Sequence, residues 1–338
     1  MKKGLIIFSF LSVLLVLPAL SQTGIPSYKI KKTIKIGGKS LSWDYVTIDK
    51  VAKRAYISNG NCVQVVDLTK DKERVIGQIP NTPGVHGIAL VPEEGKGFIT
   101  CGANDSILSF DMKTLKLLSK VKSLGKGPDF AIYDQWSYRV FVFNSSGFSL
   151  VTLDPKTGEI VGMLMLPGNP EAACIDGYGT LYVNLESVNC IAKIDTKTVK
   201  ITGLFSLGEN KQPTGLAYDN KFKRLFSGCR GSNELMITDI YTGEVVDSVA
   251  IGTKCDGVSF FPETGEILTS NGEGTINVIH QEDGEHYKQT QLLITKHGAR
   301  TIAFDENERR FLLPVAEWDN LKKDYVPGSF GIMVVSKQ

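Results

Sequence analysis

The sequence predicts an all-β fold, a seven-bladed β-propeller, and three features of the chain support this prediction. A short apolar run recurs seven times, four strand patterns make up each unit, and the strand missing at the end of the chain is found at its start. Each run ends on an Asp or Pro, and these anchors are 42 or 43 residues apart: Asp49, Pro92, Asp134, Asp176, Asp219, Pro262 and Asp305. A regular period of this length with four strands per unit is typical of propeller blades.

Each unit reads as four strands separated by turns. In the fifth unit the expected strands cover residues 215–218, 224–228, 235–239 and 244–251. Apolar and β-branched residues alternate along these runs, and Asn, Gly, Asp and Lys stand between them. We therefore expect each blade to be a four-stranded sheet.

The third strand of several units closes on an Asp-x-x-Thr pattern, at Asp111, Asp154, Asp195 and Asp239. An Asp side chain in this position can accept hydrogen bonds from the backbone of the following turn. We interpret the pattern as structural.

The ring is expected to close through its N-terminal strand. After the seventh inner strand the chain supplies two more strands, around residues 310–315 and 330–335. The segment 28–37 matches the outer strand of the fifth unit and supplies the missing fourth strand. Pairing it with the C-terminal strand leaves no free inner edge. The longest irregular segment, 317–327, is expected to overhang one mouth of the central channel.

The first 21 residues have the features of an export signal. Lys2 and Lys3 precede an apolar run at 5–17, and small residues after Pro18 predict cleavage near Ser21. The run is too short to span a bilayer comfortably, and no second long apolar stretch follows it. We expect residues 22–338 to form a single propeller domain that is periplasmic or secreted, monomeric and without a membrane span.

The charge of the chain argues against nucleic acid as a partner. The full chain has 38 Lys and Arg residues against 36 Asp and Glu residues, so loss of Lys2 and Lys3 leaves the mature chain formally neutral. A global basic field is therefore absent.

Six cysteines suit an oxidising compartment but are too few for a fold built on disulfides. Cys229 and Cys255 fall on neighbouring elements near one mouth, and we expect them to form a disulfide. For the other four cysteines, buried free thiols are at least as good an interpretation.

One residue per blade is expected where the chain enters the central channel. These positions recur every 42 to 44 residues and are Asp44, His86, Asp129, Glu171, Thr214, Asp256 and Arg300. Four carboxylates, one His and one Arg therefore converge on a single opening, which we call the acidic mouth. We expect all of them except Thr214 to contact a ligand.

The end of the second strand returns to the same opening and supplies carboxamides, among them Asn184 and Asn271. Carboxylate and carboxamide oxygens are hard ligands that suit Ca²⁺ or Mg²⁺. We therefore expect Glu171, Asn184, Asp256 and Asn271 to hold a divalent cation, and both Asn residues to belong to the ligand-binding set.

Electrostatic repulsion makes an empty ring of this kind costly. Two carboxylates about 6 Å apart repel by roughly 3 kcal/mol at an effective dielectric constant of about 20. Arg300 and a protonated His86 do not offset four such groups, so a cation binds, or the ring is wide and wet, or some pKa values rise. Three interpretations stay open: a solvated rim without a ligand, a bound cation or small polar molecule, and a catalytic site.

The chain resembles the exported YVTN-type (YncE-like) seven-bladed propellers over essentially its whole mature length. The runs that carry the resemblance include WDYVTID at 43–49, PGVHGIA at 83–89, PTGLA at 213–217 and VPGSF at 326–330. The resemblance implies the propeller fold and export. It implies no particular activity, because that family is defined mostly by its repeats.

Three functions from different classes follow. The one we favour is a non-enzymatic exported propeller that binds a small polar ligand, a divalent cation or a partner protein at the acidic mouth. The alternative is a divalent-metal-dependent hydrolase of the sugar-lactonase type, in which the expected metal ligands polarise a lactone carbonyl and Asp129 or His86 acts as the base. Binding of single-stranded nucleic acid would need a basic groove with aromatic platforms, so the acidic mouth argues against it.

Overall fold

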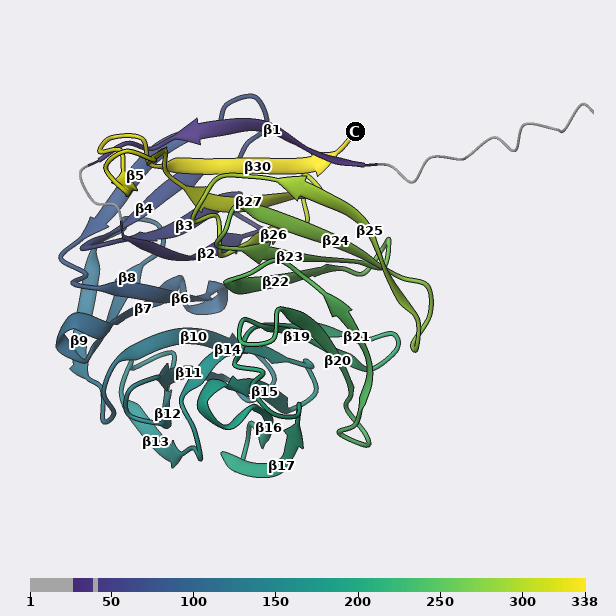
Figure 1. Ribbon diagram of the computed structural model, residues 1–338. Coiled ribbons are helices and arrows are strands. Elements are labelled where there is room, and N and C mark those ends of the chain that lie inside the picture. The colour runs from purple at the N-terminus through teal and green to yellow at the C-terminus, as the bar shows by residue number, and fades with distance from the viewer. Residues whose placement is uncertain (1–26, 39–41) are drawn as a thin grey trace, which may run out of the picture.

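The computed structural model describes residues 27–38 and 42–338. In this part of the chain, seven four-stranded antiparallel sheets follow one another around a ring, which confirms the predicted seven-bladed propeller (Figure 1). The export signal expected over residues 1–21 lies outside the described residues. Within the described ranges, no helix has the length and apolar character that a membrane span requires.

The first six blades each contain four consecutive strands that pair in chain order. Blades 1 and 2 contain β2 (Trp43–Asp49), β3 (Arg54–Asn59), β4 (Cys62–Asp67), β5 (Arg74–Pro80), β6 (Val85–Val91), β7 (Lys96–Cys101), β8 (Ser106–Asp111) and β9 (Leu117–Lys122). Blades 3 and 4 contain β10 (Pro128–Asp134), β11 (Arg139–Asn144), β12 (Ser149–Leu153), β13 (Ile160–Met165), β14 (Pro170–Ile175), β15 (Thr180–Leu185), β16 (Cys190–Asp195) and β17 (Lys200–Ser206). Blades 5 and 6 contain β18 (Pro213–Asp219), β19 (Arg224–Cys229), β20 (Glu234–Asp239), β21 (Val245–Ala250), β22 (Cys255–Phe261), β23 (Glu266–Asn271), β24 (Thr275–Gln281) and β25 (Tyr287–Ile294). The described residues also form three short 3₁₀ turns: η1 (Pro92–Glu94), η2 (Gly102–Asn104) and η3 (Glu186–Val188).

Blade 7 closes the ring with strands from both ends of the chain, as the sequence predicts. Its order is β1 (Tyr28–Lys35), β30 (Gly331–Lys337), β27 (Arg310–Val315) and β26 (Ala303–Asp305). The purple β1 and the yellow β30 lie side by side in Figure 1, and their antiparallel register runs from Tyr28 opposite Lys337 to Lys35 opposite Gly331. The first and last strands therefore hold each other in place.

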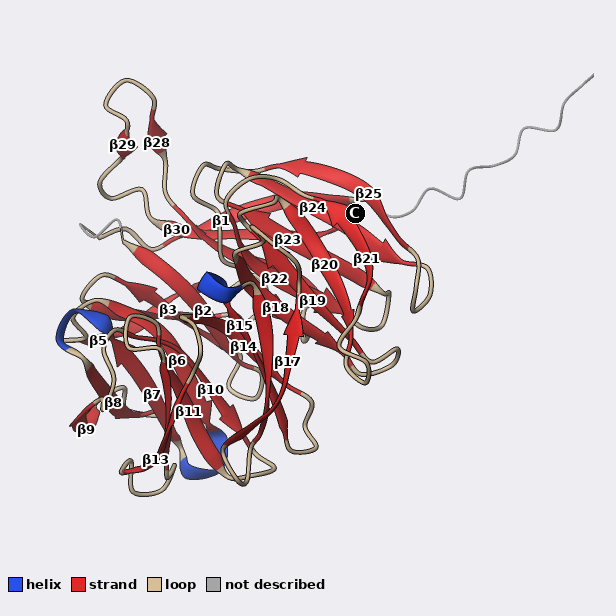
Figure 2. Cartoon of the chain, turned by 60° about the horizontal axis from the view of Figure 1, so that its bottom comes forward, coloured by secondary structure: helices blue, strands red, loops and turns tan. Residues whose placement is uncertain are grey.

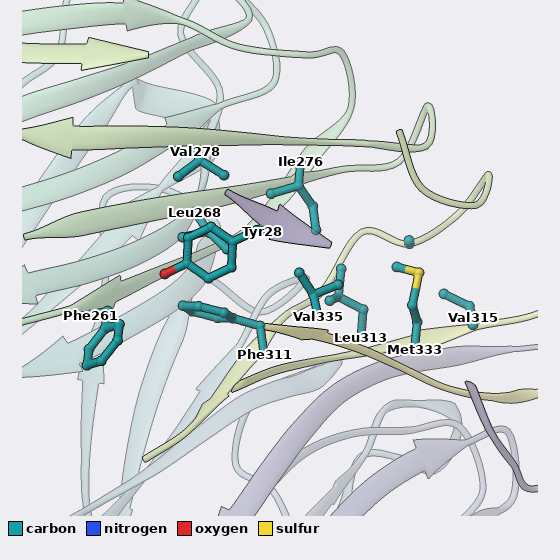
Figure 3. Close-up of a cluster of buried hydrophobic side chains, with 11 residues drawn as sticks. Tyr28, Phe261, Leu268, Ile276, Val278, Phe311, Leu313, Val315, Met333 and Val335 are labelled. Atoms are coloured by element: carbon teal, nitrogen blue, oxygen red, sulfur yellow. The ribbon is translucent and has the colours of Figure 1, made fainter. Parts of the chain in front are cut away.

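The hydrophobic core is divided into layers between neighbouring blades. The layer between blades 6 and 7 contains Tyr28, Phe261, Phe311 and Met333, all buried (Figure 3). The ring of Tyr28 packs edge-on against Phe311 at 5.7 Å between centroids, and its hydroxyl donates a 2.7 Å hydrogen bond to Glu266. The N-terminal strand thus contributes to the core as well as to the sheet.

A buried ion-pair network joins blade 7 to blade 1. The Arg310 guanidinium lies 2.8 Å from Asp305 and 2.7 Å from Glu73, and it donates to the Leu68 carbonyl. Lys32 of β1 lies 2.8 Å from the same Glu73 carboxylate. Three segments far apart in sequence are therefore fixed around one buried guanidinium.

The Asp-x-x-Thr turns are structural, as expected. Asp111 accepts hydrogen bonds from the backbone of Lys113 and Thr114, and Asp239 accepts them from Tyr241 and Thr242.

The segment at 317–327 is more ordered than expected. It contains a small hairpin, β28 (Trp318–Asp319) with β29 (Asp324–Tyr325), that stands out from the blades in Figure 2. Tyr325 packs against Trp43, the first residue of β2, at 4.6 Å between ring centroids. The hairpin therefore adjoins the acidic mouth, as predicted.

The disulfide expected between Cys229 and Cys255 was wrong, because both are buried free thiols. Each thiol lies on its own strand and is directed to a nearby carbonyl. The Sγ of Cys229 contacts the carbonyl of Ser227 at 3.6 Å, and the Sγ of Cys255 contacts that of Gly257 at 3.7 Å. The other cysteines are also unpaired in the described residues.

Candidate functional site

A recurrent bulge sets the direction of the mouth residues. In blades 1 to 6 the pairing of the inner strand with the second strand is broken just after the first residue of the inner strand. The residues that precede the break are Trp43, Val85, Pro128, Pro170, Pro213 and Cys255. Each is followed directly by one of the predicted mouth residues. A bulge bends its strand and redirects a side chain, so the same device turns one residue per blade to the opening.

Hydrogen bonds between neighbouring blades fix these bulges. The Thr214 hydroxyl donates to the carbonyl of Cys255 at 2.7 Å, and the Thr301 hydroxyl donates to that of Asp44 at 2.6 Å. Thr214 is buried, so this predicted ring position supports the mouth rather than lining it. The backbone that carries Asp44 and Asp256 is held from the preceding blade.

On one side of the mouth, an imidazole lies between two carboxylates. The Nδ1 of His86 lies 2.7 Å from Oδ2 of Asp44 and 3.6 Å from Oδ1 of Asp129. The second distance is too long for a hydrogen bond, and Oδ1 of Asp129 is buried without a hydrogen-bond partner. One ligand atom from each of these residues lies within 4.8 Å of the other two.

On the other side, carboxylates alternate with guanidinium groups. Arg300 lies 3.9 Å from Asp44 and 3.3 Å from Asp256. Arg230 lies 3.7 Å from Asp256, 3.4 Å from Glu171 and 3.1 Å from Glu186. These ion pairs bring Asp44, Glu171, Asp256 and Arg300 together, as predicted from their repeat positions.

Carboxylates outnumber the fixed cations in this network. The carboxylates are Asp44, Asp129, Glu171, Glu186 and Asp256, and the guanidinium groups are Arg230 and Arg300. Burial and the neighbouring Asp44 raise the pKa of Asp129 to about 7. Burial and Asp129 raise the pKa of Glu171 to about 9, and burial raises that of Asp256 to about 6 even beside the two arginines. The protein's own cations leave part of the repulsion uncompensated.

The pKa of His86 is raised as well, but for an imidazole a raised pKa favours the charged form. Its hydrogen bond to Asp44 raises the pKa of the imidazole above its ordinary value, and Asp129 adds to this effect. A protonated His86 therefore compensates some negative charge when no other cation is bound, and a neutral His86 is free to act as a metal ligand.

Two aromatic rings form the floor of the mouth. Tyr45 follows Asp44 in β2, and its ring packs edge-on against Phe130 at 5.0 Å. Burial and four mouth carboxylates raise the pKa of its phenol well above the usual value. Tyr45 and Phe130 also line a cavity of about 730 Å³ that continues along the channel between apolar residues such as Ala89 and Ile132. The phenol therefore lies near the mouth carboxylates, and the cavity that its ring lines contains Asp49 and Lys50 as well as apolar residues.

Asn184 and Asn271 do not join the mouth carboxylates. Both are fully buried. The Asn184 amide donates to the carbonyls of Thr214 and Gly215 at 3.0 Å, which makes it a positioning residue for the next blade. The Asn271 amide donates to Thr275 and to Asn277 within its own blade. In the described residues neither hydrogen bonds to Glu171 or Asp256, so the four-residue Ca²⁺ or Mg²⁺ set is not assembled.

Several mouth residues were not in the predicted set. Glu186 and Arg230 lie just after the second strands of blades 4 and 5, two residues after Asn184 and one residue after Cys229. Lys254 and Tyr325 line the mouth from the loop before β22 and from the hairpin. The signal for Glu186 and Arg230 was their charge, immediately after a strand that returns to the opening.

No protein-family model matches this chain, and no match is found among curated proteins.

Proposed function

We propose that this protein is an exported propeller of the YVTN type that binds a small cation in the acidic mouth and has no catalytic role. The cation is either a divalent metal ion or an organic ammonium group. Both neutralise carboxylates that the protein's own cations leave uncompensated.

The observation that supports this proposal is the environment of the Asp129 carboxylate. Its Oδ1 is buried without a hydrogen-bond partner, 3.6 Å from the only basic side chain that it pairs with in the described residues. A buried carboxylate oxygen without a partner is costly, and a bound cation would remove that cost. The neighbouring Asp44 and His86 supply the remaining contacts.

The donor set suits metal ions as well as ammonium groups. One imidazole and two carboxylates resemble the ligand sets of Zn²⁺ and Mn²⁺ more than the all-oxygen sets of Ca²⁺. An ammonium group would instead donate hydrogen bonds to Asp44 and Asp129. The hydrolase alternative gains no support, because both polar side-chain atoms of Asn184, one of its expected ligands, are bonded to Thr214 and Ser227.

Melting curves of the chelator-treated mature protein test the proposal. The probes are Mn²⁺, Zn²⁺, Ca²⁺, Mg²⁺ and L-alaninamide, a small ammonium compound without a carboxylate. A ligand at 100 times its dissociation constant stabilises the folded state by about 2.7 kcal/mol, which raises the melting temperature measurably. At least one probe is expected to produce this shift in the wild-type protein.

The Asp129→Asn variant should lose the shift, because the unpaired carboxylate is gone. Asp283→Asn is the matched control, since Asp283 pairs with His286 in an exposed turn as Asp44 pairs with His86 in the mouth. The control should keep the shift. The same shift in Asp129→Asn as in the wild type would reject the assignment of the site.

A further inference from the structure

A second compartment of the mouth has the opposite charge. A pocket of about 250 Å³ is lined by Arg230, Lys254, Asp256, His297, Arg300 and Tyr325, together with two glycines. Three permanently basic side chains face one carboxylate there. A smaller hollow of about 220 Å³ adjoins it and shares Arg300 and Tyr325.

The cations of this pocket retain unused hydrogen-bond donors. Asp256 lies 3.3 Å from Nε of Arg300 and 3.7 Å from Nη2 of Arg230. Among the described residues, the contacts of both guanidinium groups use Nε and Nη2, and Nη1 of each has no acceptor. Lys254 is exposed and forms no ion pair within the described part of the chain. These donors are available to an anionic group.

The walls of the pocket are fixed in place. Gly272 donates to the carbonyl of Lys254 and Gly298 donates to that of Gly272, both at 2.8 Å. The Tyr325 hydroxyl lies 3.3 Å from Nδ1 of His297, and a Cβ on Gly298 would come within 2.0 Å of that hydroxyl. A side chain at position 298 would therefore displace the Tyr325 hydroxyl, and the backbone φ of +79° at this position also favours glycine.

The rings of His297 and Tyr325 line one side of the pocket, and Trp318 packs against both of them. The imidazole of His297 packs on Trp318 at 4.2 Å between centroids, and Trp318 meets Tyr325 edge-on at 4.9 Å. The β28–β29 hairpin supplies both Trp318 and Tyr325 (Figure 2). The wall offers an apolar face to the part of a ligand that lies between its charged groups and solvent.

The basic pocket and the acidic compartment are contiguous. Arg300 lines the pocket, and its Nη2 lies 3.9 Å from Asp44, which in turn lies 2.7 Å from His86. A ligand that reaches both compartments therefore needs a cationic and an anionic group only a few bonds apart. A purely anionic ligand would be repelled by the excess of carboxylates, and a bare cation would leave the pocket's donors unused.

We infer that the ligand of the mouth is a small zwitterion, such as an α-amino acid, whose ammonium group binds Asp44 and Asp129 and whose carboxylate binds Arg230, Lys254 and Arg300. This inference rests on the proposed cation-binding role and adds the class of the ligand. The aromatic wall would contact the side chain of the amino acid.

Calorimetric titration with matched probes tests the inference. A panel of L-amino acids is compared with their amides, which keep the ammonium group, and with their N-acetyl derivatives, which keep the carboxylate. At least one amino acid is expected to bind tenfold or more tightly than its amide, and its N-acetyl derivative is expected to bind weakly. Equal affinities for the amino acids and their amides would overturn the inference and leave the cation-binding proposal intact. If neither amides nor metal ions bind, the cation-binding proposal fails, and the zwitterion inference fails with it.

Variants of Lys254 assign the anion subsite. Lys254→Met keeps the length of the side chain and removes its charge, and it should reduce the preference for amino acid over amide several-fold. Lys254→Arg should restore that preference. Lys120→Met on the exposed strand β9 is the control and should behave as the wild type. An unchanged preference in Lys254→Met would remove Lys254 from the site.

Discussion

Nδ1 of His86 lies 2.7 Å from Oδ2 of Asp44, and this contact joins the inner strands of blades 1 and 2 at the mouth of the channel. It leaves the third member of the group, Asp129, with a buried oxygen that has no hydrogen-bond partner. A small cation bound between these three side chains would give that oxygen a partner.

Replacing Asp129 should stabilise the ligand-free protein. Burial and Asp44 raise the pKa of this carboxyl to about 7, so its ionised form destabilises the folded state. Asp129→Asn is expected to increase the free energy of unfolding at pH 8 by roughly 1–2 kcal/mol, as measured by urea denaturation. A decrease would show that the carboxylate is already compensated within the protein.

The pH dependence of stability should reflect the raised pKa values of the mouth. In the folded state the pKa values of Asp256, Asp129 and Glu171 lie near 6, 7 and 9, above their ordinary values of 3.8, 3.8 and 4.5. The folded state therefore binds more protons than the unfolded state over this range, so stability is greatest near pH 4.5 and falls as the pH rises to 9. The raised pKa of His86 acts in the same direction.

At lower pH the trend should reverse. Ion pairs with Lys32 and Arg310 lower the pKa of Glu73 to about 2, so its contribution is lost as the pH falls from 4.5 through 2. Melting temperatures measured from pH 3 to pH 9 without ligand test both trends, the loss of stability above pH 4.5 and the loss below it. A maximum at pH 7 or above would contradict the account of the mouth.

The buried network at the closure of the ring should be sensitive to loss of its guanidinium. Arg310→Ala leaves Asp305 and Glu73 buried without Arg310, although Lys32 still pairs with Glu73. Breaking a buried ion pair by removing one partner typically costs about 3–5 kcal/mol. Denaturant unfolding measures this loss, and exposed Arg309→Ala is the neighbouring control, because its pair with Glu263 lies at the surface.

Asn184 should affect folding but not binding. Its amide satisfies the carbonyls of Thr214 and Gly215, and its side-chain oxygen accepts from Ser227. Asn184→Ala is expected to lower the free energy of unfolding by roughly 1–3 kcal/mol. The affinity for the bound cation should stay within about twofold of the wild-type value. Loss of cation binding in a folded Asn184→Ala protein would show instead that Asn184 contacts the ligand.

The sequence was sufficient to predict the fold and the inner ring of the site. Repeats present equivalent positions to one axis, so spacing alone placed Asp44, Asp129 and Asp256 at one opening. The direction of the Asn184 side chain could not be predicted in the same way. Its blade has a different spacing between strands, and Leu185 rather than Asn184 pairs with the first residue of the inner strand. A shift of one residue turns a strand side chain to the other face of its sheet.

The basic pocket could not be predicted from the repeat, for another reason. Lys254 lies in the loop before β22, at a position where the other blades carry different residue types, and Tyr325 comes from a hairpin that has no counterpart in the other blades of the described chain. Their position depends on tertiary contacts such as that of Trp43 with Tyr325 rather than on a periodic pattern.

Titration calorimetry of the chelator-treated mature protein at pH 7 tests the central claim most directly. The titrants are Mn²⁺, Zn²⁺ and L-alaninamide, each added separately to the wild-type protein, Asp129→Asn and Asp283→Asn. We predict saturable binding of at least one cation at about one site per chain in the wild type and in Asp283→Asn, and none in Asp129→Asn. Absence of binding by every cation, or equal binding by all three proteins, would contradict a cation site at the acidic mouth.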